Sequence, residues 1–186
     1  MNTEAFKIFS FEQTRDSSTY IERIGEPIEF HAVIGLISLK FQILEDNITS
    51  KLIEMSGLSK EIGMILTAEL SFKNKAHLFS SLCNHLKDSH RFNYLRGYED
   101  VEISSFVKAF FKCEEMRNKI LHSSIKVDYM SKKILRKKIT AKARQGLKTV
   151  EEVVDISYLM DVADFCGQID YALDEFFIYF GPKKSK

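Results

Sequence analysis

Three side chains within one short stretch could do chemistry on a phosphate. Arg117, Asn118 and His122 lie in the sequence Arg-Asn-Lys-Ile-Leu-His, at what the pattern indicates is the end of an apolar helix. An imidazole titrates near neutral pH, so a histidine can accept or donate a proton. A guanidinium stays charged and offers phosphate oxygens a planar fork of donors. Together these groups suit attack of a ribose 2′-hydroxyl on the neighbouring phosphate, a reaction that needs no metal ion.

Helix geometry limits how these residues can cooperate. Positions 117 and 122 differ by about 140° around an ideal helix, whereas positions 118 and 122 nearly eclipse. Asn118 could therefore orient His122, but Arg117 does not reach the same point from a straight helix. Either the helix unwinds where Ser123 and Ser124 follow, or two subunits bring their motifs together. We favour a homodimer, because it would supply two histidines, one for each proton transfer.

The helix that positions the motif is predicted from about residue 100 to 121 or 122. Arg117 occupies a place in its apolar stripe where the pattern requires a hydrophobe, and a guanidinium is costly to bury unless an anion or a hydrogen-bonding group meets it. Arg117 is therefore a candidate for function rather than for packing. The stripe follows three-and-four spacing through Ile103, Phe106, Phe110, Cys113, Arg117 and Ile120.

The other elements also read as helices. A long one is predicted from Pro27 to about Met55, with Gly57 as its C-terminal cap. Its two apolar stripes require a cover on more than one side, from the bundle or from a second subunit. Ser59, Ser71 and Asp155 are predicted N-caps of three further helices. The two stripes are Phe30, Ile34, Ile37, Phe41, Leu44 and Ile48, then Ala32, Leu36, Leu39 and Ile43; the helix after Ser59 holds Ile62, Ile65, Leu66 and Leu70.

The predicted fold class is all-α, an antiparallel bundle of four to five main helices. No proline interrupts residues 28 to 181, which favours long helices. The 186 residues suit a single domain, 1–186, with residues 1–26 as an N-terminal arm. The three cysteines contain no CxxC pair and read as small buried hydrophobes of a reduced, cytoplasmic protein. Neither a secretory signal nor a membrane span is indicated.

A basic segment breaks the helical pattern. Residues 126–148 contain nine Lys or Arg against one Asp, a charge of +8, and since the chain is +1 overall the remainder carries −7. We expect an extended strand or hairpin between the last two helices, an insertion spanning 126–150. Such a positive surface would attract the phosphates of RNA, although a solvated charged surface is the alternative. The candidate RNA contacts are Lys137, Lys138, Lys142 and Arg144.

Other kinds of site find little support in the sequence. The cluster around His85 and His90 lacks the spacing that places two imidazoles on one helix face, so no metal site is expected. Glycine-rich phosphate loops and a GxSxG elbow are absent, and no cofactor is expected. Glu114 and Glu115 could pair with Arg117 or with a lysine, or simply be solvated.

The motif resembles that of the HEPN superfamily: an arginine, a polar residue, a few further residues and a histidine, on the third major helix of an all-α chain. Residues 66–82 look like the helix-pair junction of prokaryotic HEPN domains, and residues 117–148 resemble the segment that follows the motif in some bacterial members. The resemblance spans about residues 26–180, but only the short motif is diagnostic of function.

The resemblance implies a metal-independent endoribonuclease that acts as a homodimer, with Arg117 and His122 catalytic and Asn118 as the polar motif member. Many such proteins are toxins or phage-defence effectors, and some are paired with a nucleotidyltransferase antitoxin. Members that this partner modifies have a tyrosine two residues after the histidine, where this chain has Ser124. Two alternatives stay open: a non-catalytic module that binds a nucleotide or a protein through the same residues, and a purely structural bundle subunit.

Overall fold

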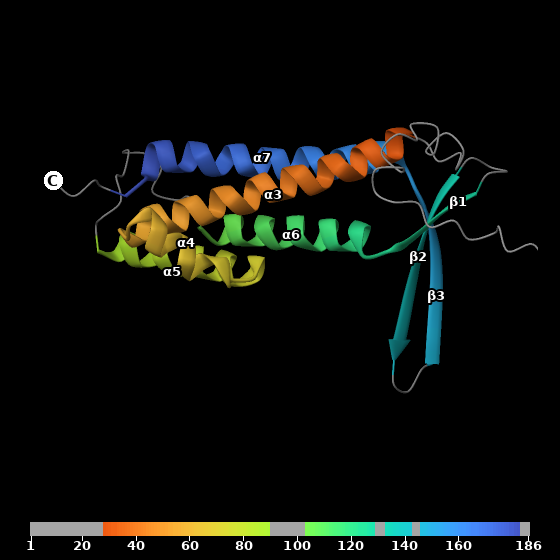
Figure 1. Cartoon of the computed structure of the whole chain (residues 1–186), viewed down its shortest axis with the longest axis horizontal. Coiled ribbons are helices and arrows are strands. Elements are labelled where there is room, and N and C mark those ends of the chain that lie inside the picture. The colour runs from red at the N-terminus through yellow and green to blue at the C-terminus, as the bar shows by residue number, and fades with distance from the viewer. Residues whose placement is uncertain (1–27, 90–102, 129–132, 143–145, 183–186) are drawn as a thin grey trace, which may run out of the picture.

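The fold is that of a computed structural model, which describes residues 28–89, 103–128, 133–142 and 146–182 (Figure 1). The predicted N-terminal arm, residues 1–26, lies outside the described residues. The described helices are α3 (Ile28–Ser56), α4 (Lys60–Ala68), α5 (Phe72–Asp88), α6 (Ile103–Leu121) and α7 (Ile156–Phe180). The strands are β1 (Ser124–Asp128), β2 (Lys133–Lys142) and β3 (Gly146–Val154). The predicted helical bundle is thus confirmed, with a basic extended segment before its last helix.

Local signals fix most helix ends where the sequence predicts them. The Ser59 and Ser71 hydroxyls accept hydrogen bonds from the N–H groups of the third residue on, which caps α4 and α5. The Asp155 carboxylate accepts a 3.0 Å bond from the N–H of Ser157 and caps α7. Gly57 ends α3 with a φ of +70°, a conformation that glycine adopts without a steric penalty.

The long helices lie side by side, and α6 runs opposite to α3 and α7 (Figure 1). Two polar pairs give the relative direction of α3 and α7. Asn47 donates to Asp170 at 2.8 Å, and Lys51 pairs with Asp174 at 2.9 Å, so both helices advance together along the same direction. The first apolar stripe of α3 faces this bundle and is buried, apart from the half-buried Ile34.

The basic segment forms a three-stranded antiparallel sheet in the order β1-β2-β3. It begins earlier and ends later than the predicted insertion, because β1 starts at Ser124 and β3 runs to Val154. At its root, Ile134 is 4% exposed and joins a core cluster with Ile120 of the motif helix. The far part of β2 and β3 extends away from the helices (Figure 1). The sheet is therefore anchored at the motif end of the bundle.

All three cysteines are buried, as predicted. Burial raises the pKa of the Cys83 thiol to about 12, so this residue behaves as a hydrophobe rather than as a nucleophile. No helix in the described part of the chain has the length and apolar content needed to cross a membrane.

Two apolar surfaces remain uncovered by the described residues. On the second stripe of α3, Leu39 is 57% and Ile43 is 42% exposed. The apolar residues predicted for the helix after Ser59 also face outwards: Ile62, Ile65 and Leu66 of α4 are more than half exposed. Among the described residues, the second stripe of α3 is therefore covered only at Leu36, which is half-buried against the core.

Candidate functional site

The motif begins in the last turn of α6, which ends at Leu121, and His122 follows directly, at the end of the bundle where the sheet begins (Figure 1). The N–H of His122 donates to the carbonyl of Asn118 at 3.0 Å, so the helix is still regular when it reaches the histidine. The pattern changes directly after it, where the N–H of Ser123 donates to the carbonyl of Ile120 at 3.4 Å, so the helix ends where the sequence has Ser123 and Ser124.

Arg117 is half-buried and lies against an aromatic ring. Its guanidinium carbon is 5.2 Å from the ring centroid of Phe41, a cation–π distance, and its Nη1 donates to the side-chain oxygen of Asn118 at 2.8 Å. Its Nε is buried and has no hydrogen-bond partner among the described residues. Within the described ranges no carboxylate lies at ion-pair distance from it. The guanidinium is positioned but its charge is not neutralised.

Asn118 and His122 are arranged differently from the sequence prediction. Asn118 was expected to orient the imidazole, but its amide oxygen accepts from Arg117 instead, because the two side chains are adjacent and both half-buried. His122 is exposed, and none of the residues that the structure describes hydrogen-bonds to its imidazole. Glu115 does not neutralise Arg117 either, since it pairs with Lys112 at 3.0 Å.

A second arginine fastens the sheet to the motif. Arg136 of β2 is only 4% exposed, and its Nη1 donates to the carbonyl of Lys119, inside the motif, at 3.2 Å. Its Nη2 forms an ion pair with Glu152, its partner in register on β3. Arg136 is one of the nine basic residues of 126–148, and its burial removes it from the positive surface predicted for that segment. Arg136 donates to a carbonyl in the last turn of α6 that also accepts from the Ser123 hydroxyl, and so ties the strand pair to the end of this helix.

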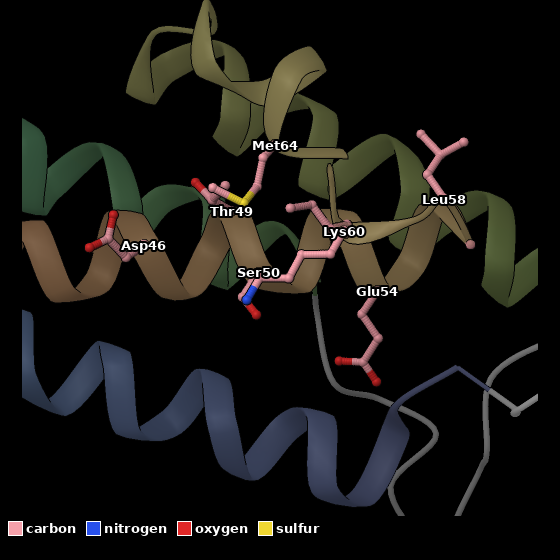
Figure 2. A pocket seen from close by; sticks show the side chains of 9 residues that line it. Asp46, Thr49, Ser50, Glu54, Leu58, Lys60 and Met64 are labelled. Carbon is pink, nitrogen blue, oxygen red and sulfur yellow. The ribbon is translucent and has the colours of Figure 1, made fainter. Parts of the chain in front are cut away.

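Two cavities lined by described residues bear on where a small group could bind. The smaller, of about 270 Å³, lies beside the motif, between Lys119 and Ile120 of α6 and Tyr158 of α7, with Arg136 and Glu152 in its wall. The larger, of about 610 Å³, lies at the junction of α3 and α4, between Thr49 and Met64 (Figure 2). Only the smaller cavity adjoins the residues predicted to do chemistry.

The structure separates the predicted RNA-binding residues. Lys137 is half-buried on β2, in register with Ser124 of β1 and Glu151 of β3. Strand alternation assigns positions 138 and 142 to the opposite face of the sheet from position 137. The side chains of Lys138 and Lys142, and the whole of Arg144, lie outside the described residues.

Two features of the site were not predicted from the sequence. Phe41 was read as a core residue of the long helix, and no local signal indicates that it would carry Arg117 on its ring. The pairing of Arg136 with Glu152 depends on the strand register, which the sequence does not give. The signal that could have suggested this pairing is the presence of basic residues in one strand and of two glutamates in the next.

The remaining observations bear on what the chain could bind and on its relatives. Within the described ranges, no group of three His, Cys, Asp or Glu side chains could hold a metal ion. The motif therefore offers a fixed guanidinium, a neighbouring amide and an exposed imidazole as its chemical groups. Comparison of the chain with protein-family models, curated proteins and solved structures found no match.

Proposed function

We propose that this protein is a metal-independent endoribonuclease of the HEPN type. The observation that carries the proposal is the state of Arg117: half-buried on Phe41, with no carboxylate at ion-pair distance among the described residues and with an unpartnered Nε. A cation in such a place lacks the counter-charge that buried cations usually have. A phosphate group bound at the guanidinium would supply that counter-charge.

The proposed reaction uses one imidazole and one guanidinium at each scissile phosphate. The 2′-hydroxyl gives its proton to His122 while its oxygen forms a bond to phosphorus, and the bond from phosphorus to the 5′-oxygen breaks. An imidazolium protonates the leaving 5′-oxygen. Arg117 stabilises the charge that develops on the non-bridging oxygens. The products are a 2′,3′-cyclic phosphate and a 5′-hydroxyl, with no net change in protons.

Two copies of the chain would complete the site. The helix is regular through His122, so Arg117 and His122 of one copy project in directions that differ by about 140°. Pairing of two motif ends across a two-fold axis would bring the arginine of one copy towards the histidine of the other. It would also supply separate histidines for the two proton transfers. A homodimer is therefore part of the proposal.

The sheet gives RNA a basic approach to the motif. Its root is fastened to the last turn of α6 by Arg136 and Ile134, and the remaining strands carry most of the excess positive charge of the chain. RNA bound along the sheet would be held next to His122 by contacts with its phosphates. A toxin or phage-defence effector, held inactive by a partner protein until needed, is the cellular role consistent with such an activity.

The decisive experiment is incubation with total RNA in the presence of a chelator. We expect cuts that leave cyclic phosphate ends, and we expect His122→Ala to abolish them while circular dichroism shows an unchanged helix content. His85→Ala is a matched control, since His85 is also an exposed helical histidine but belongs to α5. Full cleavage by the His122→Ala protein would refute the assignment. Relief of toxicity on expression by the same change would extend the test to cells.

One observation favours a second function. No described residue hydrogen-bonds to the His122 imidazole, whereas catalytic histidines are commonly oriented by a neighbouring group. A non-catalytic module that binds a nucleotide or a protein through Arg117 would need no such orientation. RNA binding that depends on Arg117, without cleavage under any condition, would support this alternative.

A further inference from the structure

The smaller cavity, beside the motif, combines apolar and charged side chains in its lining. The apolar part includes three buried residues, Phe30, Ile120 and Leu159. Among the other lining residues, two are basic and two are acidic: Lys119, Arg136, Glu152 and Asp155. Binding sites for small molecules have this kind of composition, with a mostly apolar wall and a few polar groups that fix the ligand.

Three polar groups of the lining are available to a ligand. Lys119, Glu152 and Tyr158 are all exposed, and no described residue pairs with the Lys119 ammonium or hydrogen-bonds to the Tyr158 hydroxyl. Glu152 uses its Oε2 in the ion pair with Arg136, and its Oε1 has no partner in the described ranges. Because Arg136 is buried and bonded to the carbonyl of Lys119, it fixes Glu152 in the cavity wall.

The volume and the charge of this cavity favour a flat, neutral ligand. Its volume of about 270 Å³ lies just below the range of about 300–1,000 Å³ that holds drug-sized molecules, so it suits one ring system. Its two basic and two acidic residues give the lining no net charge, so it has no general attraction for a free phosphate. Proteins recognise unpaired RNA bases in such sites, by contact with the faces of the ring and hydrogen bonds to its edge.

We propose that this cavity binds a guanine base of the RNA substrate, in a nucleotide next to the scissile phosphate. The proposal rests on the nuclease function given above and adds to it a preference for sequence. Lys119 and His122 are three positions apart in a backbone that is still helical at His122, so their Cβ atoms are neighbours, about 5–6 Å apart. A base held at Lys119 therefore belongs to a nucleotide whose phosphate can reach His122.

Guanine is the base whose edge matches the available groups. Its N1–H and N2–H groups donate side by side, and a carboxylate such as that of Glu152 can accept both. Its O6 lies next to N1 and accepts a hydrogen bond from a lysine such as Lys119. Adenine and cytosine offer a carboxylate one amino group, and uracil offers one N–H, so each leaves a contact unmade. The ring of Tyr158 and the apolar lining would contact the faces of the base.

The first test is the binding of guanosine, adenosine, cytidine and uridine to the full chain, measured by saturation-transfer NMR. We expect guanosine to bind about tenfold more tightly than the others, and Glu152→Gln to remove this preference. Glu151→Gln is the matched control, because it makes the same change of charge one position away, on the opposite face of β3, and should bind guanosine as the wild type does. No binding, equal binding of all four nucleosides, or a preference that persists in Glu152→Gln would overturn the proposal.

A second pair of variants leaves the ion pair of Arg136 with Glu152 intact. Tyr158→Ala should weaken guanosine binding at least about fivefold, since it removes an aromatic ring from the site. Tyr179→Ala is its control, because Tyr179 belongs to the same helix, is 49% exposed against 41% for Tyr158, and lies at the other end of α7. Equal guanosine affinities of these two variants would also overturn the proposal.

Mapping of the cleavage sites separates this inference from the nuclease assignment. We expect a guanosine beside the bonds that the wild type cuts, and cutting without this preference in Glu152→Gln. Cleavage next to all four nucleotides alike would overturn the guanine site and leave the nuclease intact. Nucleoside binding needs no cleavage, so a guanosine preference that depends on Glu152, in a protein that cuts no RNA, would support the guanine site and refute the nuclease.

Discussion

Arg117 and Arg136 show how two arginines in similar local sequence acquire different roles. Each has a buried Nε without a partner among the described residues. Arg136 has its charge compensated by Glu152 and donates to a backbone carbonyl, so it is a structural clamp. Arg117 lies on an aromatic ring beside a neutral amide, and in the part of the chain that the structure describes no carboxylate pairs with it. The difference arises from tertiary partners, which a position in the chain does not disclose.

A functional cation of this kind should contribute little to stability. We predict that Arg117→Met leaves the free energy of unfolding unchanged or raises it by up to about 1 kcal/mol, because it removes a desolvated charge and fills the same space beside Phe41. RNA cleavage should be lost. Urea denaturation measures the first quantity, and the chelator assay measures the second.

The control for this prediction is a residue with a purely packing role. Phe110 is fully buried on the same helix, and Phe110→Ala should lower the free energy of unfolding by about 3–5 kcal/mol. If Arg117→Met instead destabilised the fold by more than about 2 kcal/mol, its role would be structural and the functional assignment of the arginine would lose its basis.

At the scale of elements, the sequence was sufficient where the determining interactions are local. Ser59, Ser71 and Asp155 each bond to a backbone N–H two or three residues away, so their caps could be predicted from the chain alone. The apolar stripes of α3 and α6 were equally predictable, since their period is a property of the helix itself.

The rest depends on contacts between residues far apart in the chain. The sequence predicted that Ile62, Ile65 and Leu66 form a stripe, but their outward direction follows from the fit of Gly63 against Ile53. The stacking of Arg117 on Phe41 likewise joins positions on two helices. Strand register, which pairs position 136 with 152, is set by the hairpin as a whole. Only the types of the site residues, not their partners, were therefore accessible from the sequence.

The Arg136 clamp can be tested at this scale. We predict that Arg136→Ala lowers the free energy of unfolding by about 2–4 kcal/mol, because it leaves the carbonyl of Lys119 without this donor and removes a buried side chain from the root of the sheet. Glu152→Gln should cost less, since Glu152 is half exposed and its amide can still accept a hydrogen bond. Hydrogen exchange at the end of α6 should rise in Arg136→Ala; equal losses in the two variants would contradict the clamp.

The contact between α3 and α7 should respond to pH. The hydrogen bond from Lys51 lowers the pKa of the Asp174 carboxyl below its usual value. A lowered folded-state pKa contributes stability above the unfolded-state value, and this contribution is lost as pH falls through the folded-state value. Asp174→Asn should therefore cost about 0.2–1 kcal/mol at pH 7 and less than that at pH 2. Urea midpoints of both proteins at the two pH values measure this, and a difference of the same size in acid would exclude the ion pair as its cause.

At the scale of the whole molecule, the basic segment and the rest of the chain carry opposite net charges. Residues 126–148 carry +8 and the rest of the chain −7, so the sheet is the basic part of a mildly acidic protein. Ile134 and Arg136 attach the root of the sheet to the motif helix, so the basic segment begins directly beside the motif. An acidic bundle would repel RNA elsewhere and leave the sheet as its approach.

The two faces of that sheet should differ in their effect on RNA binding. On one face Lys133 is in register with Asp128 and Lys137 with Glu151, so each of these lysines lies opposite an acidic residue; we call this the compensated face. On the other face, Lys138 is in register with Val150, and Lys142 with Gly146. Lys148 shares that face, in register with Thr140, and no acidic residue is in register with these three lysines. The uncompensated face is therefore the better phosphate track.

We predict that replacing Lys138, Lys142 and Lys148 by Gln in a His122→Ala background weakens RNA binding and reduces the slope of log K against log salt by about 2, given about 0.7 per phosphate contact for single strands. The matched variant, with Lys126, Lys133 and Lys137 replaced by Gln, removes the same charge from the compensated face and should change the slope by less than half as much. Fluorescence anisotropy with a labelled RNA over a salt series measures both. Since net charge falls equally in the two proteins, a general electrostatic attraction would give equal slopes. Only a localised track along one face produces a difference between them.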